Sequence, residues 1–365
     1  MSKYLLSGYY GFDNIGDEAI LMSLAAGLKS IDEKVGITAL SADPELTADR
    51  YKIRSISRNN ILSIMKEIRG CEYFVSGGGS LLQDLTGWKS IPYYLGQVLI
   101  AQLMGRKTVF YAQGIGPVKG KFYRWLIKKV MNRANYISVR DSKSKELLVD
   151  WGIDPNQLKL SVDPVFILKE LADDYTNSDI KIKTTKSRKP LIGVSVRPWG
   201  DNEYIDKFAE SLSKFAAEID ANIIIIPFHI NQDQAISEKL KEKVISRWNE
   251  DNYKADIILS EVETPLQVLS IYKELDFLLG VRLHSLIFSV LNNVPFVAIE
   301  YDPKIAGFLE VIGINYSVDI NNIDVEQLYR ICHSVWSSND KIKELLEQQG
   351  DLLAKIAIED VNELV

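Results

Sequence analysis

The sequence contains few residues of the kinds that build disulfide frameworks or metal centres. Among its 365 residues are two cysteines and three histidines. Cys71 and Cys332 lie far apart in apolar surroundings, and their spacing fits neither a disulfide pattern nor a zinc site. We therefore expect two reduced, buried thiols in a cytosolic protein, and no metal.

Long apolar runs and an excess of positive charge are also missing. The apolar run near the N-terminus is too short for a signal peptide, and no segment approaches the length of a transmembrane helix. The formal net charge of −6 argues against a general nucleic-acid binder, which would usually be basic. With 46% hydrophobic and 25% charged residues, the composition is globular, and the length suits two domains. We expect a soluble, cytoplasmic protein.

Short apolar runs alternate with longer amphipathic patterns along the chain. Runs at 4–10 and 35–41 flank a helical pattern at 17–31, and similar alternation continues in both halves. This order is typical of an α/β protein with a mainly parallel sheet and helices on both faces. A polar, charge-rich stretch over 169–190 lacks any sustained period, and the alternation restarts at Leu191.

This interruption divides the chain into two α/β halves. In chain order we predict an N-terminal Rossmann-like domain, a polar linker, a C-terminal Rossmann-like domain and a set of C-terminal helices, at 1–168, 169–190, 191–323 and 324–365. Two such domains form a cleft, and ligands of parallel sheets bind beyond the carboxyl ends of the strands.

Glycine-rich segments follow three predicted strands of the first half. They are “GFDNIGDE” (11–18), “SGGGSLLQD” (76–84) and “YAQGIGP” (111–117). Glycines let the backbone approach a ligand closely, and the N–H groups of helix starts favour anions. Each segment alone could equally be a tight turn between a strand and a helix. None is a dinucleotide-binding or Walker motif, which disfavours NAD and P-loop binding.

Cationic and imidazole side chains gather at predicted strand ends. They are Arg140 in the first half, and Arg197, His229, Arg282, His284 and Lys304 in the second. A single arginine at such a place is usually a surface residue in a salt bridge. The whole set suits a small, highly charged anion, since each arginine bond to a carboxylate or phosphate oxygen contributes about 1.5–3 kcal/mol. Metal binding is disfavoured, because the set is mostly cationic and no carboxylate cluster accompanies it.

Seven segments resemble, in this order, a bacterial polysaccharide pyruvyl transferase of the CsaB type. The resemblance runs from about residue 4 to residue 310, and the segments are “GYYGFDNIGDEAIL”, “SGGGSLLQD”, “YAQGIGP”, “SVRD”, “SVRPW”, “GVRLHSLIFS” and “IEYDPK”. The resemblance implies a fold like that of GT-B glycosyltransferases, with two Rossmann-like domains facing across a cleft. It also implies phosphoenolpyruvate as co-substrate, no further cofactor, and a 4,6-linked pyruvate ketal on a sugar as product. The usual acceptor of this type is an N-acetylmannosamine residue of a lipid-linked secondary cell-wall precursor, whose ketal helps to hold S-layer homology domains at the cell surface.

The chemistry of phosphoenolpyruvate suggests a role for His284. The donor carries a carboxylate and a phosphate of nearly two charges, and its C2 becomes electrophilic only when C3 is protonated. One sugar hydroxyl then adds at C2, and a second displaces phosphate. Histidine has an unperturbed pKa of about 6.5 and suits this proton transfer, so we expect His284 to be the acid. The alternative is a histidine that packs against its own turn. Nearby cations favour a low histidine pKa, an effect that the bound anion would offset.

The predicted donor site includes two residues that the resemblance marks as functional, Arg140 and Lys304. We assign both to the carboxylate or the phosphate of the donor, with surface salt bridges as the alternative. The other predicted members of this site are Arg197, His229, Arg282 and Ser285.

The predicted acceptor site lies in the first half of the chain. Its members are Asp13, Asn14, Gly78, Gly79 and Gln113. Asp13 is expected to contact the sugar, whereas Asp17 is expected to cap the helix that follows. His333 lies in a helical pattern and has no expected role.

The stretch 119–133 mixes six basic residues with aromatic and aliphatic ones. A helix of this composition could lie on an anionic surface at the inner face of the cytoplasmic membrane, which a lipid-linked acceptor would make useful. It could also be an ordinary domain helix with a solvated basic face.

Two other functions compete with pyruvyl transfer. A glycosyltransferase of the same architecture would use a nucleotide sugar. The “RLHS…IEYDPK” pairing disfavours it, as does the lack of an obvious acidic ribose-binding residue, for which Glu300 is the nearest candidate. A non-catalytic glycan or anion sensor would have no need of a proton donor at His284.

Overall fold

The computed structural model describes residues 2–84, 90–170, 189–251 and 253–364. The chain divides into two compact units, one formed by Met1–Leu171 with Leu353–Val365 and the other by Ala172–Leu352. Most of the predicted linker at 169–190 lies outside the described residues.

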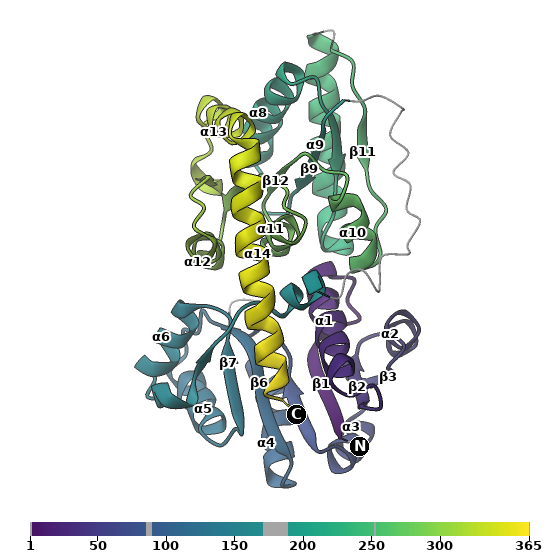
Figure 1. Cartoon of the computed structure of the whole chain (residues 1–365), viewed down its shortest axis with the longest axis vertical. Coiled ribbons are helices and arrows are strands. Elements are labelled where there is room, and N and C mark those ends of the chain that lie inside the picture. Colours follow the sequence, from purple (N-terminus) through teal and green to yellow (C-terminus); the bar gives the residue numbers. More distant parts are fainter. Residues whose placement is uncertain (1, 85–89, 171–188, 252, 365) are drawn as a thin grey trace. The chain divides into compact units, whose positions relative to one another are not determined.

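The first unit is built on a parallel sheet of eight strands (Figure 1). The strand order is β3-β2-β1-β4-β6-β7-β8, and β5 pairs with β6. The strands are β1 (Lys3–Tyr10), β2 (Gly36–Ser41), β3 (Arg54–Ser57), β4 (Tyr73–Ser76), β5 (Gly79–Leu82), β6 (Lys107–Ile115), β7 (Tyr136–Val139) and β8 (Lys159–Leu160). Its helices include α1 (Ile15–Ile31), α2 (Pro44–Tyr51), α3 (Ile61–Gly70), α4 (Ser90–Leu103), α5 (Lys121–Met131), α6 (Ser142–Asp150) and the 3₁₀ turns η1 (Pro155–Gln157) and η2 (Pro164–Phe166).

Helices α3 to α6 cover one face of this sheet. Buried side chains of these four helices form a single hydrophobic cluster with strand residues such as Leu5, Phe110 and Ile137. Successive strand residues point to opposite faces of a sheet, so Tyr4 and Tyr136 point to the other face.

The C-terminal part of α14 (Asn339–Asn362) packs on that other face. The hydroxyl of Tyr4 donates to the carbonyl of Leu364 at 2.7 Å, and Tyr136 and Ser138 both donate to the buried carboxylate of Asp360, the latter at 2.9 Å. One continuous helix therefore begins in the second unit and ends in the core of the first.

The second unit has a parallel sheet of six strands in the order β11-β10-β9-β12-β13-β14. The strands are β9 (Leu191–Ser195), β10 (Asn222–Ile225), β11 (Ile257–Leu259), β12 (Phe277–Gly280), β13 (Phe296–Glu300) and β14 (Ser317–Asp319). The helices of this unit, besides the start of α14, include α8 (Tyr204–Glu218), α9 (Ile230–Glu250), α10 (Pro265–Tyr272), α11 (Leu283–Leu291), α12 (Pro303–Ile312), α13 (Val325–Ser337) and the 3₁₀ turn η3 (Ile320–Asn322). Strands β9, β10 and β12 are buried along their whole length, as expected of central parallel strands covered on both faces.

Both sheets contain a point at which the order of the strands reverses. In the first sheet, β2 and β4 lie on opposite sides of β1, and in the second, β10 and β12 lie on opposite sides of β9. The loops that leave the two central strands at such a point diverge and leave a crevice for a ligand. The predicted α/β class with two Rossmann-like domains is confirmed.

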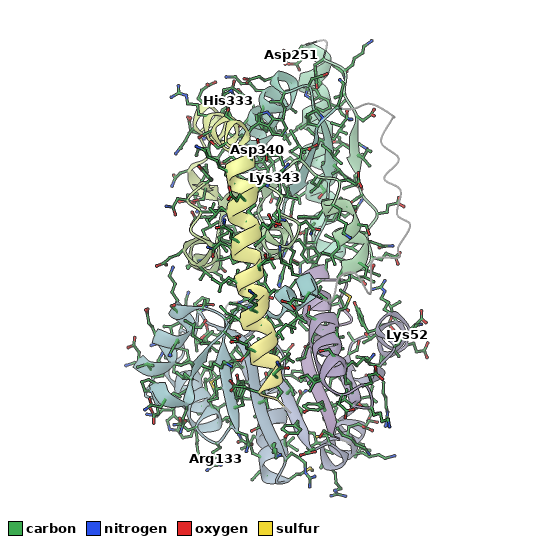
Figure 2. The ribbon with its side chains drawn as sticks, in the orientation of Figure 1. Lys52, Arg133, Asp251, His333, Asp340 and Lys343 are labelled. Atoms are coloured by element: carbon green, nitrogen blue, oxygen red, sulfur yellow. The ribbon has the colours of Figure 1, made fainter. Side chains whose placement is uncertain are left out.

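His333 lies on α13, as expected of a helical residue. It is exposed at the surface (Figure 2), and its Nε2 lies 3.3 Å from a carboxylate oxygen of Glu218. Among the described residues, none of the helices combines the length and the apolar character needed to span a membrane.

Candidate active site

Four neighbouring strands of the second sheet present predicted donor residues at their carboxyl ends. Arg197 follows β9, His229 follows β10, Arg282 follows β12, and Lys304 follows β13. The strand order β10-β9-β12-β13 makes these four strand ends neighbours along one edge of the sheet. Arg197 and Arg282 leave the two strands that flank the reversal point, where ligands of such sheets bind.

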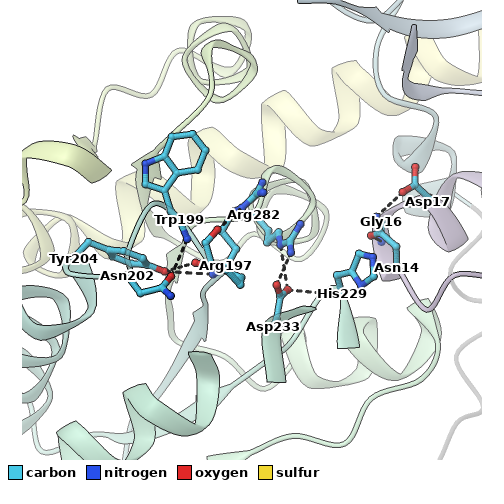
Figure 3. Close-up of polar contacts among 11 residues, drawn as sticks. Asn14, Gly16, Asp17, Arg197, Trp199, Asn202, Tyr204, His229, Asp233 and Arg282 are labelled. Atoms are coloured by element: carbon cyan, nitrogen blue, oxygen red, sulfur yellow. Dashed lines mark hydrogen bonds and ion pairs between the residues drawn. The ribbon is translucent and has the colours of Figure 1, made fainter. Parts of the chain in front are cut away.

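The guanidinium of Arg282 is held by a buried carboxylate (Figure 3). Its Nε donates to Oδ2 of Asp233 at 3.1 Å, and its Nη2 donates to Oδ1. The same Oδ2 accepts the backbone N–H of His229 at 2.9 Å. Asp233, in the first turn of α9, therefore fixes both Arg282 and the chain that enters this helix.

Asp233 was not among the predicted site residues. Its position in the first turn of a helix indicates only a favourable interaction with the helix dipole. The pairing with Arg282 depends on the strand order, which places the loops after β10 and β12 on either side of β9. No local signal in the sequence reveals that contact.

Arg197 is held by aromatic rings. Its guanidinium carbon lies 4.1 Å from the ring centroid of Tyr301, and the ring of Trp199 lies 5.3 Å from that of Tyr301. The hydroxyl of Tyr204 donates to the backbone carbonyl of Arg197 at 2.7 Å. In the described part of the chain, no carboxylate lies within ion-pair distance of Arg197. Its positive charge is stacked on an aromatic face and not neutralised, which suits a ligand anion.

Lys304 has a looser partner. Its Nζ lies 3.5 Å from Oδ2 of Asp302, and its side chain remains partly exposed. Asp302 also caps α12, since its Oδ1 accepts the backbone N–H of Lys304 at 3.0 Å. Of these three predicted cations, Arg282 is thus tightly paired with a carboxylate, Lys304 is loosely paired, and Arg197 is stacked on an aromatic ring.

His229, His284 and Ser285 lie at helix starts on the same edge. His229 immediately precedes α9 and its side chain is buried. His284 is the second residue of α11 and is partly exposed, at the helix end that carries positive partial charge. Ser285 is buried, and its hydroxyl donates to the carbonyl of Arg282 at 2.5 Å. The hydroxyl of Ser285 stabilises this turn, so its predicted contact with the donor would require the bond to break.

Arg140 belongs to the first unit, whereas the other predicted donor residues belong to the second. It follows β7, and its Nη1 donates to Oδ2 of Asp163 at 2.5 Å while its Nη2 donates to Oγ of Ser80 at 3.2 Å. Both partners of the ion pair are buried. Asp163 also caps η2 through the backbone N–H of Val165. The pair therefore ties β7 to η2, and a role in donor binding stays a prediction.

The predicted acceptor residues of the “GFDNIGDE” segment lie beside the reversal point of the first sheet. Asn14 caps α1, since its Oδ1 accepts the backbone N–H of Gly16 at 3.2 Å, and its Nδ2 donates to Asp17 at 2.5 Å. The expectation that Asp17 caps this helix is wrong, because the N-cap is Asn14; Asp17 lies three residues further along in the first turn, where the helix dipole favours a carboxylate. Asp13 is partly exposed and has a left-handed backbone with a φ of 55°.

The glycine-rich segment after β4 is closely packed. A Cβ at Gly78 would lie 2.9 Å from Cγ of Pro164, and Gly79 has a φ of 90°, which few other residues adopt. Gln113, buried in β6, donates from Nε2 to the carbonyls of Ser76 at 3.1 Å and of Gly77. Gln113 holds the glycine segment in place, so the NH₂ group of its side chain is already engaged by the protein.

An aromatic cluster beside Asp13 was not predicted from the sequence. The rings of Tyr9 and Phe12 stack with centroids 4.1 Å apart. The guanidinium carbon of Arg58 lies 4.8 Å from the ring of Phe12 and 4.6 Å from that of Tyr93. Within the described ranges, Arg58 has no carboxylate at ion-pair distance. Flat apolar faces and a cation on one sheet edge can bind the ring and the oxygens of a sugar.

Over the described residues, no three histidine, cysteine, aspartate or glutamate side chains gather as metal ligands would. The groups that the two sheet edges do present are cations, imidazoles and helix starts.

Two Rossmann-like domains, each with a parallel sheet whose strand order reverses, place the chain in the GT-B-like fold class. Among solved structures, the chain is similar to UDP-GlcNAc 2-epimerase from Neisseria meningitidis (TM-score 0.68, 10% identity, 99% of each chain). It is also similar to a glycosyltransferase from Rickettsia africae (TM-score 0.67, 15% identity, 100% of this chain and 97% of that one). These likenesses show the fold alone.

The family is shown by the sequence. The model of the polysaccharide pyruvyl transferase family matches residues 14–303, and the chain belongs to this family. The amylovoran biosynthesis protein AmsJ of Erwinia amylovora is 21% identical over 369 residues, which cover 86% of each protein. The predicted enzyme class, a polysaccharide pyruvyl transferase, is confirmed.

Proposed function

We propose that the protein transfers pyruvate from phosphoenolpyruvate to two hydroxyls of one sugar, which forms a 4,6-ketal and releases phosphate. The observation that carries this proposal is the edge of the second sheet, where Arg197, Arg282 and Lys304 accompany His284 at the start of α11. Family membership supplies the pyruvyl group and the sugar acceptor, and the cationic edge suits a donor with a carboxylate and a phosphate.

Three cations share the donor anion in this proposal. The guanidinium of Arg197 is free of carboxylates in the described part of the chain and takes one anionic group of the donor in a two-pronged contact. Arg282 uses Nε and Nη2 for Asp233, so its Nη1 is the group that points to the donor. The ammonium of Lys304 is loosely held by Asp302 and moves to the phosphate.

His284 supplies the proton in the first step. It protonates C3 of the donor while a sugar hydroxyl oxygen bonds to C2 and releases its own proton back to the imidazole. A second hydroxyl oxygen then bonds to C2 as the bond from C2 to the phosphate oxygen breaks, and its proton leaves with phosphate. A positioned acid of this kind accelerates a reaction by about 10²–10⁴-fold.

The acceptor is assigned to the edge of the first sheet. Asp13 and Asn14 would contact sugar hydroxyls, and the cluster of Tyr9, Phe12 and Arg58 would contact the ring. We propose the CsaB type of acceptor, an N-acetylmannosamine of a lipid-linked secondary cell-wall precursor, because the motif order of this chain resembles that type.

The test is to incubate the protein with phosphoenolpyruvate and a β-ManNAc-GlcNAc acceptor, and to measure free phosphate and the ketal by NMR. His284→Ala should fold, bind the donor in calorimetry and lose at least about 100-fold in turnover. His333→Ala, which removes an exposed histidine of the same unit, is the matched control and should keep full turnover. Near-normal turnover of His284→Ala would remove this assignment. Release of UDP from a UDP-sugar, with no consumption of phosphoenolpyruvate, would replace pyruvyl transfer by glycosyl transfer.

A further inference from the structure

Two helices of the first unit expose large apolar side chains within their first five residues. On α3, Ile61 is 68% and Leu62 is 81% exposed, and on α5, Phe122 is 65% and Trp125 is 51% exposed. Both helices follow strands of the parallel sheet, so their first turns lie at the carboxyl edge. Helix α4 contacts both α3 and α5, and all three pack on the same face of the sheet. The four side chains therefore belong to one side of this unit.

The exposed residues of α5 are not needed for its packing. The helix is anchored by Ile127, Val130 and Met131, which are buried in the hydrophobic cluster. On the opposite side the rings of Phe122 and Trp125 stack at 5.8 Å, and Nζ of Lys129 lies 4.9 Å from the ring centroid of Trp125. Exposed aromatic rings beside lysines are typical of helices that lie in a membrane interface.

The charge of this region contrasts with that of the whole protein. Residues 58–133 contain twelve lysines and arginines and three carboxylates, in a chain with a net charge of −6. The carboxylates are engaged, since Glu67 pairs with Arg54 at 2.6 Å, Glu72 pairs with Lys107 at 3.1 Å, and Asp84 accepts the backbone N–H of Lys119 at 2.7 Å. Helix α4 carries no charged residue at all.

The basic residues of α5 are mostly at the surface. Lys121 and Lys129 are exposed, and Arg133, just beyond the end of α5, projects outward (Figure 2). No acidic residue occurs between 119 and 133. This segment therefore presents positive charge next to the exposed aromatic rings.

We propose that the face formed by α3, α4 and α5 docks on the surface of an anionic phospholipid bilayer. Ile61, Leu62, Phe122 and Trp125 enter the headgroup region, and Lys121, Lys129 and Arg133 contact lipid phosphates. A second copy of the chain is a poorer occupant, because two such basic faces repel each other. A nucleic acid would leave the exposed leucine and isoleucine in water, whereas a bilayer covers them. The inference rests on this surface and not on the reaction assigned above.

The test is co-sedimentation with vesicles of phosphatidylcholine alone and of phosphatidylcholine with phosphatidylglycerol. The protein should bind the anionic vesicles, bind neutral ones much more weakly, and dissociate as salt rises. The double variant Lys121→Gln and Lys129→Gln should weaken binding to anionic vesicles by about 25-fold, since each basic residue near such a surface contributes roughly a factor of five. Phe122→Ala with Trp125→Ala should weaken binding to anionic vesicles as well.

The matched control removes two exposed lysines elsewhere. Lys207→Gln with Lys239→Gln, on α8 and α9, has the same change in net charge and should bind as the unaltered protein does. Equal loss in this control, or equal binding to neutral and anionic vesicles, would overturn the proposal. A dimer in solution that the α5 variants abolish, without vesicle binding, would assign the face to a second copy instead. Phosphate release with a water-soluble acceptor should be unchanged in the α5 variants. Intact vesicle binding in the α5 variants would overturn the docking proposal whatever their activity. If the unaltered protein binds anionic vesicles but releases no phosphate from phosphoenolpyruvate, the proposed function fails and the docking proposal stands.

Discussion

Replacement of Asp233 by asparagine would remove the negative charge that holds Arg282 while keeping nearly the same side-chain volume. Asp233 is fully buried and the Arg282 side chain is 13% exposed. The asparagine oxygen could accept one of the two guanidinium bonds or the backbone N–H of His229. The asparagine NH₂ group, however, can only donate, and it would face another N–H donor without forming a hydrogen bond. Arg282 would then be a buried cation without a counter-charge.

The size of the effect follows from this burial. Loss of one partner of a buried ion pair costs about 3–5 kcal/mol, and because Arg282 is partly exposed we expect a loss of about 3 kcal/mol. The free energy of unfolding, measured by urea titration with tryptophan fluorescence, should fall by that amount. Asp206→Asn is the matched control, because Asp206 pairs with Lys243 at the surface of the same unit and such pairs contribute about 0–1 kcal/mol.

A second substitution separates stability from function. In the Asp233→Asn background, Arg282→Met removes the uncompensated charge and should restore part of the lost stability. Turnover should fall in Asp233→Asn, because Arg282 is no longer fixed, and should not recover in the double variant. If Asp233→Asn unfolds at the same urea concentration as the unaltered protein and keeps its kcat/KM, the role of Asp233 as a positioning residue is refuted.

Three further predictions follow from side chains in other environments. Arg197→Lys should raise the KM for phosphoenolpyruvate by about 10–100-fold, because an ammonium cannot reproduce the two parallel bonds of a guanidinium to an anion. Arg330→Lys, at an exposed site, is the control and should leave the KM unchanged. Equal KM values for the two variants would contradict the role of Arg197. Burial raises the pKa of Glu18 above its usual 4.5, so the folded state binds this proton more tightly than the unfolded chain, and stability falls as pH rises above that value. Glu18→Gln should flatten this fall in urea titrations, and an unchanged slope would contradict the assignment. Burial raises the pKa of Cys71 to about 11 and that of Cys332 well above the ordinary value. Neither thiol of the native protein should therefore react with a disulfide reagent at about pH 8, whereas both should react once urea unfolds the protein. Fast reaction of the native protein would contradict their burial.

The fold could be predicted because its signals are local. Apolar runs bounded by turns gave the strands, and segments such as “SGGGS” and “RLHS” mark strand ends at which parallel sheets place ligands. The buried thiols followed from the apolar neighbours of Cys71 and Cys332, and the structure confirms that both are free and buried.

The partners of the site residues could not be predicted, because they depend on contacts between distant segments. Asp233 and Arg282 are 49 positions apart and follow different strands. Arg58, which follows β3, contacts the rings of Phe12, which follows β1, and of Tyr93, which lies in α4. A sequence pattern shows whether a residue is polar or aromatic. Which distant residue it contacts is determined by the order of the strands, which the pattern does not give.

The last helix makes the order of synthesis matter. Leu353, Ala357, Val361 and Leu364 are buried against the first unit, whose strands are otherwise complete by residue 160. A nascent chain usually folds domain by domain from its N-terminus, yet here one face of the sheet that emerges first from the ribosome stays only partly covered, by α1, until the end of α14 is made. Early release or C-terminal trimming would therefore damage the half of the protein that was translated first.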